Sequence, residues 1–425
     1  MEQTPKANRV HIGFFGRCNA GKSTLINMLT DQPVSLVSEV AGTTTDPVSK
    51  SMEILPLGPV VITDTAGIDD TSELGALRIE KSEEIIKKIN LAVYVLRNDE
   101  APTADDMIWL NTLKQNNVPI ALFINEINAS DSESTHDNDS NGNDTNLNYV
   151  DAYPDLSAIA TVVGSTDFTS NRDRLALLDL LGGLTPLDVE GEQSLLQGLV
   201  DPGDTIILVC PIDSAAPKGR LILPQVQTIR EILDHKGLAL VCQTEELPTM
   251  LNKLSQKPKL VITDSQAFEA VNALTPADIP LTSFSILMAR FKGKLQDLVT
   301  GVKALNNLKP GARVLISEGC THRRQCDDIG TVKIPMWLKK KGHTDLQLEF
   351  TSGGAFPKDV SGYDLIIHCG ACMLTRREVL RRIDCAVVQG TPIVNYGVLI
   401  ASLHGILERA ISPFMDELDR KGFEC

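Results

Sequence analysis

The amino-acid sequence predicts an α/β protein with three domains: a P-loop nucleotide-binding domain followed by two smaller parallel-sheet α/β domains. Near the start, a buried strand runs into a glycine-rich loop and then a helix. Short apolar strands continue to alternate with helical segments through most of the 425 residues, as in chains that build parallel sheets. Paired cysteines and histidines follow two late strands, which indicates a metal site in the last domain.

The composition is that of an ordinary globular protein, with 42% hydrophobic and 22% charged residues. The formal net charge of −15 disfavours a nucleic-acid partner, because polyanion binding needs a basic surface. Residues 1–6 lack the apolar core of a signal peptide, and no apolar run approaches the length of a membrane span. Nine cysteines, an odd number, indicate reduced thiols rather than a disulfide framework. We therefore expect a cytoplasmic protein.

The first strand, residues 9–15, leads into residues 16–23, whose sequence GRCNAGKS matches the P-loop pattern G-x-x-x-x-G-K-[ST]. A helix is predicted over residues 23–29, so the strand–loop–helix context is present. The glycines let backbone N–H groups surround phosphates at the helix N-terminus. Lys22 is expected to reach the β- and γ-phosphates, and the Ser23 hydroxyl to bind Mg²⁺. A chance match is the weaker interpretation.

Two further segments of a GTPase-type site follow in the expected order. The polar loop at residues 42–46 contains Thr44, which is expected to complete the Mg²⁺ shell and to sense the γ-phosphate. The strand at residues 60–63 delivers Asp64, which is expected to act on Mg²⁺ through water. Three residues later, the Gly67 N–H is expected to contact the γ-phosphate. We therefore predict Lys22, Thr44 and Gly67 as the catalytic residues.

Asn19 within the P-loop, the GTTTD loop at residues 42–46 and the DTAGI segment at residues 64–68 resemble the TrmE-Era-EngA class of GTPases. The resemblance implies that Asn19 coordinates a K⁺ ion, which supplies the positive charge that other GTPases take from an arginine finger. Ile68 stands where a Ras-like enzyme has its water-orienting glutamine. No general base is visible, and we expect slow, K⁺-stimulated GTP hydrolysis.

The guanine-reading loop departs from the pattern of that class. After the strand at residues 121–124, the chain has Asn125-Glu126-Ile127-Asn128 in place of Asn-Lys-x-Asp. Asn128 presents hydrogen-bond donors where an aspartate only accepts, so we expect weaker guanine affinity or relaxed base choice. The predicted GTP/GDP-binding set is Gly16, Asn19, Ala20, Gly21, Lys22, Ser23, Thr24, Thr43, Thr44, Asp64, Gly67, Asn125 and Asn128.

The first domain is predicted to span residues 1–182, with a polar surface insertion at residues 129–148 that lacks apolar periodicity. The second is predicted over residues 186–264, as a small parallel sheet without catalytic residues. An exposed edge of such a sheet is often buried by a partner, so we assign this domain to dimerisation. Cys210 and Cys242 end two of its strands and are interpreted as core thiols.

The third domain, residues 265–425, contains the metal motif. Its strand at residues 313–316 is followed by Cys320-Thr321-His322, and its strand at residues 365–367 by His368-Cys369-Gly370-Ala371-Cys372. Ligands at the carboxyl ends of neighbouring parallel strands converge at one edge of a sheet. Thiolates suit an iron–sulfur cluster or zinc, and the spacing alone does not separate the two. Arg376, Arg377, Arg381 and Arg382 are predicted to form a solvated helix face.

A P-loop GTPase joined to a C-x-H…H-C-x-x-C domain resembles the [FeFe]-hydrogenase maturation GTPases, the HydF family. The specific marks are GTTTDP, DTAGIDD, PIDSAAPKGRLILPQVQ, and C-T-H with H-C-G-A-C. The resemblance implies a [4Fe-4S] cluster on Cys320, Cys369 and Cys372, with His322 or His368 as an exchangeable fourth ligand.

The resemblance also implies a homodimer or a higher oligomer that acts as a scaffold. It would carry a CO/CN⁻-ligated diiron precursor, made with two radical-SAM maturases of the HydE and HydG types, to apo-[FeFe]-hydrogenase, with GTP gating the exchange of partners. Two alternatives remain open. One is a TrmE/Era-like GTPase of RNA or ribosome biology with a structural zinc module. The other is a GTPase-deficient iron–sulfur cluster carrier.

Overall fold

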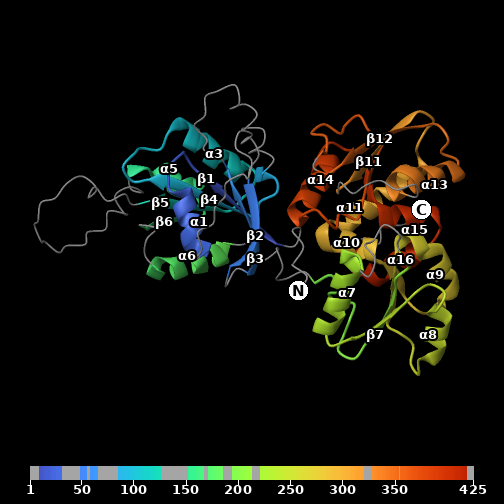
Figure 1. Cartoon of the computed structure of the whole chain (residues 1–425). Coiled ribbons are helices and arrows are strands. Elements are labelled where there is room, and N and C mark those ends of the chain that lie inside the picture. The colour runs from blue at the N-terminus through green and yellow to red at the C-terminus, as the bar shows by residue number, and fades with distance from the viewer. Residues whose placement is uncertain are drawn as a thin grey trace, which may run out of the picture. The chain divides into compact units, whose positions relative to one another are not determined.

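The computed structural model describes residues 9–30, 48–54, 58–65, 85–125, 152–166, 171–184, 194–212, 221–319, 328–353 and 355–418. The chain divides into two compact units, residues 1–190 and 191–425 (Figure 1). Within the described residues, no helix combines the length and the apolar character needed to cross a membrane.

The first unit is built on a six-stranded sheet with the strand order β2-β3-β1-β4-β5-β6. Only β2 runs antiparallel to its neighbour. The strands are β1 (Val10–Phe15), β2 (Val48–Ile54), β3 (Gly58–Asp64), β4 (Leu91–Arg97), β5 (Ile120–Asn125) and β6 (Val162–Thr166). The helices are α1 (Lys22–Thr30), α3 (Ala104–Gln115), α5 (Pro154–Ile159) and α6 (Asn171–Leu184). The strands predicted at residues 9–15, 60–63 and 121–124 are thus confirmed.

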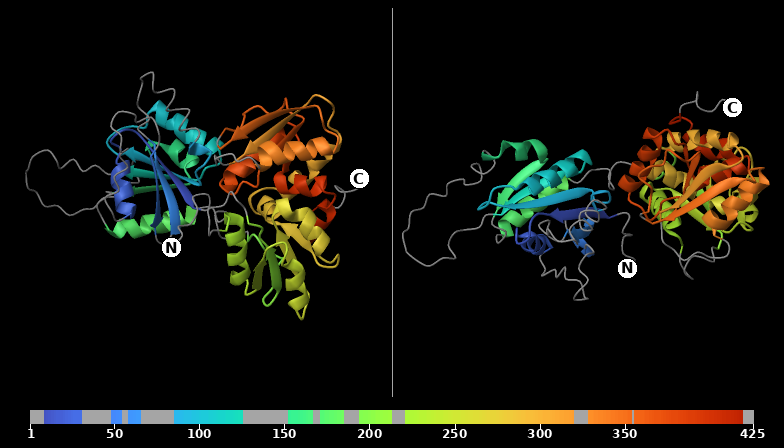
Figure 2. Two further views of the ribbon diagram at one scale, coloured as in Figure 1. Left: turned by 45° about the vertical axis from the view of Figure 1, so that its right-hand side comes forward. Right: turned by 90° about the horizontal axis from the view of Figure 1, so that it is seen from above.

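Helices cover both faces of this sheet, as Figure 2 shows. Consecutive residues of β1 enter different cores: Phe14 packs in the cluster that includes residues of α1 and α6, and Phe15 in the cluster that includes residues of α3. A strand buried on both faces needs a continuous apolar run rather than an alternating one. The run Leu91–Leu96 of β4, buried throughout, is such a strand.

The second unit contains two four-stranded parallel sheets, with the orders β10-β9-β7-β8 and β12-β11-β13-β14. The strands are β7 (Thr205–Val209), β8 (Leu238–Cys242), β9 (Leu260–Thr263), β10 (Leu281–Ser283), β11 (Ala312–Glu318), β12 (Leu346–Ser352), β13 (Leu365–His368) and β14 (Ile393–Asn395). The helices are α7 (Leu223–Asp234), α8 (Leu247–Lys253), α9 (Phe268–Leu274), α10 (Phe284–Lys292), α11 (Leu295–Thr300), α12 (Val302–Asn306), α13 (Ile334–Lys340), α14 (Arg376–Val388), α15 (Tyr396–Leu403) and α16 (Leu407–Ile411). Short turns of other helix types lie at Ser265–Ala267, Ile329–Lys333 and Ser412–Phe414.

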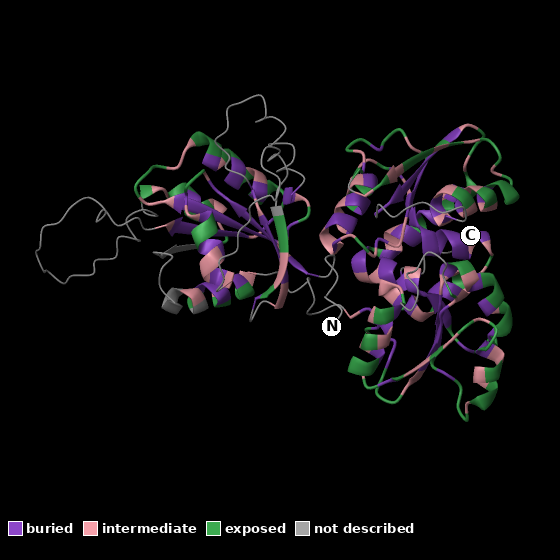
Figure 3. Cartoon of the chain, viewed as in Figure 1, coloured by how far each residue is buried: buried purple, intermediate pink, exposed green. Residues whose placement is uncertain are grey.

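One apolar core extends through both sheets of the second unit. Helix α10 is central to it, because it packs against α7 on the side of the first sheet and against α14 and α15 on the side of the second. Figure 3 shows that the inner strands of both sheets are mainly buried, whereas exposed positions lie on the outer helices and on the edge strands β8 and β12. The predicted boundary at residue 264 falls inside the first of the two sheets, since β10 pairs with β9.

Candidate functional site

The P-loop connects β1 to α1, and its backbone bends sharply at Gly16, where φ is 132°. A Cβ atom at Gly16 would lie 2.4 Å from the carbonyl oxygen of Val95, so no larger residue fits there. Asn19 also has a positive φ, of 60°, which asparagine tolerates better than most residues. Ser23 and Thr24 are exposed in the first turn of α1, where a helix N-terminus favours anions.

Lys22 is buried at the start of α1, and its ammonium group binds the P-loop itself. Its Nζ donates to the carbonyl oxygens of Gly16, at 2.8 Å, and Arg17, at 2.6 Å. The side chain therefore lies along the inside of the loop, where a bound phosphate would compete with these carbonyls for its protons.

Asp64, at the end of β3, has a buried carboxylate oxygen, Oδ1, with no hydrogen-bond partner among the described residues. Burial raises the pKa of this carboxyl, and the nearby charge of Lys22 opposes the shift. The next residue, Thr65, donates from both N and Oγ1 to the carbonyl of Phe14 and so fixes the end of β3 against β1. An unsatisfied carboxylate oxygen beside a P-loop lysine fits a role in the hydration shell of a Mg²⁺ ion.

Asn125 joins the end of β5 to the P-loop. Its Nδ2 donates to the carbonyl oxygen of Ala20 at 3.1 Å, and Ala20 is itself buried. The structure thus brings Asn125 and the P-loop together, although β4 lies between β5 and β1 in the sheet. Thr43, Thr44, Gly67 and Asn128 lie outside the described residues.

Arg17 is a P-loop residue whose role could not be predicted, because it occupies a variable position of the motif. Its guanidinium lies 2.7 Å from Glu100 and 3.4 Å from Asp106, and it donates to the carbonyl of Ala101. Asp106 is fully buried and also accepts from the hydroxyl of Tyr94 at 2.8 Å. Arg17 therefore ties the P-loop to the segment that precedes α3.

The two halves of the cysteine–histidine motif follow neighbouring strands of the last sheet. Strands β11 and β13 are parallel partners, and Ser317 pairs with His368. Cys369 Sγ accepts hydrogen bonds from the backbone N–H of Gly319 at 3.0 Å and of Ala371 at 3.3 Å. The backbone that leads into Cys320 thus contacts Cys369 directly, although Cys320 and His322 themselves lie outside the described residues.

Lys292, the last residue of α10, binds the backbone of the C-x-x-C turn. This side chain is only 2% exposed, and its Nζ donates to the carbonyl oxygens of Ala371 at 3.4 Å, Cys372 at 3.1 Å and Leu374 at 2.8 Å. Ala371 adopts a positive φ of 54°, which is unusual for alanine and marks a sharp local bend. No motif or spacing in the sequence marks Lys292 as part of this site.

Burial raises the pKa of the Cys369 thiol to about 11, against the opposing effect of the Gly319 and Ala371 N–H groups. Burial also raises the pKa of Cys372, which the charge of Lys292 opposes. The same burial lowers the pKa of Lys292 to about 8, while the two cysteines act to raise it. Metal coordination deprotonates a thiol outright, so two half-buried thiols beside N–H donors and an ammonium group suit a soft metal or a cluster. Within the described residues, no group of three or more His, Cys, Asp and Glu side chains forms a complete ligand set.

His368 is buried, and both of its ring nitrogens have protein partners. Nδ1 lies 2.9 Å from the carbonyl oxygen of Cys369, and Nε2 lies 3.2 Å from Nη1 of Arg382. One neutral tautomer satisfies both contacts, with Nδ1–H donating and Nε2 accepting. Burial, together with the charge of Arg382, lowers the pKa of His368 to about 4, which keeps the ring neutral.

The prediction that the arginines after Cys372 form a solvated helix face is wrong for Arg382. This residue of α14 is 1% exposed, donates to Glu378 at 2.7 Å and to the carbonyl of Gly353 at 2.6 Å, and lies over the ring of Phe356. Glu378 lies one helical turn earlier and supplies the negative charge that makes this burial tolerable. Arg381 binds the same carboxylate through two hydrogen bonds.

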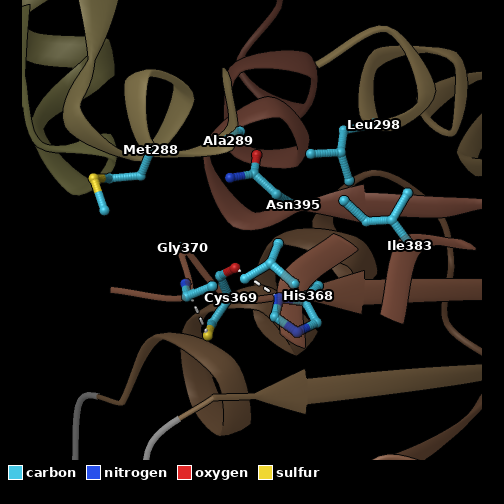
Figure 4. A pocket seen from close by; sticks show the side chains of 10 residues that line it. Met288, Ala289, Leu298, His368, Cys369, Gly370, Ile383 and Asn395 are labelled. Carbon is cyan, nitrogen blue, oxygen red and sulfur yellow. Dashed lines mark hydrogen bonds between the residues drawn. The ribbon is translucent and has the colours of Figure 1, made fainter. Parts of the chain in front are cut away.

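A small, mainly apolar pocket lies beside the strand end that carries the motif. Figure 4 shows Met288, Ala289 and Leu298 across from Cys369 and His368. Its lining comes from α10, α11, α14, the end of β13 with the turn that follows it, and the end of β14. It comprises Met288, Ala289, Leu298, His368, Cys369, Gly370, Ala371, Val379, Ile383 and Asn395. The pocket lining is therefore apolar apart from His368, Asn395 and the start of the turn at residues 369–374, which is called the ligand turn below.

The fold and the two sites define a P-loop GTPase domain joined to a cysteine-containing α/β unit. A family model described as a 50S ribosome-binding GTPase matches residues 11–126. Models described as the hydrogen maturase F dimerization and tetramerization domains match residues 195–293 and 296–413, respectively. The chain belongs to the hydrogen maturase F (HydF) family of hydrogenase-maturation GTPases. The descriptions of these two domains support self-association.

Curated relatives include tRNA modification GTPases. The tRNA modification GTPase MnmE of Endomicrobium trichonymphae is 31% identical over 121 residues, which cover 28% of this chain and 26% of that protein. MnmE of Cereibacter sphaeroides is 40% identical over 113 residues, covering 24% and 26%. The chain thus spans about a quarter of the length of these relatives. Among solved structures, an Era variant of Aquifex aeolicus bound to GDP and aluminium fluoride has 21% identity and a TM-score of 0.33, covering 54% of this chain and 91% of that one.

Proposed function

We propose that this chain is a GTP-binding scaffold that holds a [4Fe-4S] cluster and assembles or delivers the diiron precursor of the [FeFe]-hydrogenase active site. The observation that carries the proposal is the contact between the backbone just before Cys320 and the second half of the motif. Gly319, immediately before Cys320, donates its N–H to Cys369 Sγ. Backbone N–H groups that point at a sulfur favour its thiolate form and are a usual part of cluster sites.

Cys320, Cys369 and Cys372 are the proposed cluster ligands. With three thiolates, one iron of the bound cluster keeps an exchangeable position at which a precursor can attach. His322 is the better candidate for the fourth ligand, because both nitrogens of His368 already have protein partners. His368 then orients the backbone of Cys369 through its Nδ1–H.

The nucleotide site acts as the switch in this proposal. Lys22 would exchange its two P-loop carbonyls for phosphate oxygens, while Ser23, Thr44 and Asp64 hold Mg²⁺ directly or through water. Asn19 would ligate K⁺, and Thr44 and Gly67 would sense the γ-phosphate. Slow GTP hydrolysis would gate the exchange of partners. Asn125, which matches the first residue of the Asn-Lys-x-Asp pattern, contacts the P-loop. Binding of the nucleotide base near Asn125 would therefore affect the loop that surrounds the phosphates.

The proposed partners are a second copy of the chain, two radical-SAM maturases and apo-[FeFe]-hydrogenase, in the cytoplasm. Self-association is supported by β8, an edge strand of its sheet on which Leu238 and Val241 are 57% and 43% exposed. Free sheet edges with apolar side chains invite pairing with another chain.

Anaerobic reconstitution with iron and sulfide, followed by EPR of the dithionite-reduced protein, tests the cluster. We expect about four irons per chain and an S = 1/2 signal that added imidazole perturbs. Cys369→Ser should abolish the signal, and Cys385→Ser, a change on α14 outside the motif, should leave it intact. His322→Ala should alter the imidazole response more than His368→Ala does.

Stoichiometric zinc without an EPR signal would overturn the scaffold proposal and leave a GTPase with a structural zinc module. A cluster without any GTP turnover, in the presence of K⁺, would indicate a cluster carrier whose GTPase site no longer hydrolyses nucleotide.

A further inference from the structure

The described part of the second unit buries two cationic side chains, Arg382 and Lys292, and they differ in one respect. Arg382 is neutralised by the carboxylate of Glu378 at 2.7 Å. Lys292 contacts three carbonyl oxygens and forms no ion pair with any described carboxylate. A buried charge without a counter-charge is unfavourable, so an anionic group is expected beside Lys292 in the working protein.

The three carbonyls that Lys292 binds all belong to the ligand turn, at Ala371, Cys372 and Leu374. An ammonium group has three N–H donors, and each of them finds an acceptor there. Two contacts therefore hold the turn. Gly319 donates its N–H to the sulfur of Cys369, and Lys292 donates to the backbone carbonyl of Cys372. A neutral hydrogen-bond donor could also bind these carbonyls. The hydrogen bonds alone therefore do not explain why a positively charged side chain is buried at this position.

We propose that Lys292 is a positioning residue for the cluster, which fixes the C-x-x-C turn and places a positive charge beside Cys369 and Cys372. The inference rests on the proposed cluster function. A thiolate-ligated cluster is negatively charged, and a further electron increases that charge. A buried cation against the ligand turn therefore stabilises the bound cluster and favours its reduced form, because net charge and local electrostatics set cluster potentials.

The test compares three reconstituted proteins: wild type, Lys292→Met and Lys294→Met. Lys294 is two residues further along and half-exposed, and it pairs with Asp384 at the surface, so its removal controls for the loss of a lysine. EPR-monitored redox titration gives the midpoint potential, and iron release to a chelator gives cluster retention. We expect Lys292→Met to have a more negative potential and about tenfold faster iron loss, within the range for lost outer-sphere support of a metal site. Lys294→Met should match wild type.

Lys292→Gln separates the two roles and covers the case in which the methionine variant does not fold. Glutamine keeps two N–H donors for the turn and removes the charge. We expect it to retain iron better than Lys292→Met but to share its more negative potential. Folding is checked on the metal-free proteins by circular dichroism and gel filtration.

Wild-type potential and wild-type iron retention in the folded Lys292 variants would overturn the inference, with the cluster proposal unaffected. A wild-type protein that takes up no cluster would instead overturn the proposed function, and the role of Lys292 with it. The two failures are thus distinguishable in the same experiment.

Discussion

Asp64 has a carboxylate oxygen, Oδ1, that is buried without a hydrogen-bond partner among the described residues, which leaves it available to an added ligand. We expect Asp64→Asn to weaken Mg²⁺-dependent GTP binding by about 10–100-fold, as for the loss of an outer-sphere metal contact. The metal-free variant should be no less stable, since a neutral amide is easier to bury than a carboxylate. Fluorescent-nucleotide titrations with and without Mg²⁺ measure this, with Asp105→Asn on the exposed side of α3 as the control. Unchanged Mg²⁺ dependence would remove Asp64 from the site.

Arg382 lies among His368, Glu378 and Phe356, and its removal should be costly. We expect Arg382→Met to lower the free energy of unfolding by about 3 kcal/mol, the lower end for breaking a buried ion pair, because Arg381 still binds Glu378. Arg381→Met, at a more exposed position, should cost well under half as much. Urea unfolding of both variants checks this order, and equal losses would contradict it.

The same pair predicts a pH dependence. Burial raises the pKa of Glu378, but its bonds to Arg381 and Arg382 outweigh burial and leave the pKa lower than in the unfolded chain. A lowered carboxyl pKa stabilises the fold above the unfolded-state value of about 4.5 and loses that effect as the pH falls through the folded-state value. The stability gap between wild type and Arg382→Met should therefore narrow in acid.

The strand–loop–helix arrangement at the P-loop could be predicted from the sequence, because that motif fixes backbone conformation and spacing together. The sequence did not predict Lys292 or Arg382. Both are charged residues on amphipathic helices, and helical spacing alone does not show that a charge points inward. The burial of each side chain is explained by its partners in the fold. Lys292 binds carbonyls of the ligand turn, about 80 residues further along the chain, and Arg382 binds the carboxylate of Glu378.

At the scale of elements, strand β8 lies at the free edge of its sheet and exposes apolar side chains. We expect Val241→Lys to shift the chain from dimer towards monomer without unfolding it, because a lysine on an edge strand opposes pairing with another copy. Sedimentation velocity measures the shift. The control is Leu274→Lys, a similarly exposed apolar position at the end of α9 in the same unit. An unchanged dimer in Val241→Lys would place the self-association surface elsewhere.

Most strands could be predicted from their apolar runs, and β10 could not. It has three residues, Leu281–Ser283, too few for a run to be recognised, and it exists through its pairing with β9. Missing β10 led to a boundary at residue 264, inside the sheet. The core explains why no composition change marks the join: α10 starts directly after β10 and packs on helices of both sheets.

At the scale of the whole molecule, the nucleotide residues and the cysteine motif belong to different compact units, each with its own apolar core. Because each unit has its own core, we expect that GTP binding and cluster binding can be removed one at a time. Lys22→Ala removes the ammonium that binds the P-loop carbonyls, and it should abolish GTP binding while leaving iron content at wild-type level. Cys369→Ala should abolish the cluster while leaving GTP affinity unchanged. Lys50→Ala, on the exposed side of β2, should change neither.

The independence of the two sites is tested by measuring iron content, the EPR signal and GTP affinity on four proteins: wild type and the three variants. Independent losses in the two variants fit a switch and a carrier that influence each other only through partner exchange, since neither site then needs the other to form. Loss of the cluster in Lys22→Ala, with the second unit still folded by circular dichroism, would contradict this independence. It would mean that an intact nucleotide site contributes free energy to cluster binding.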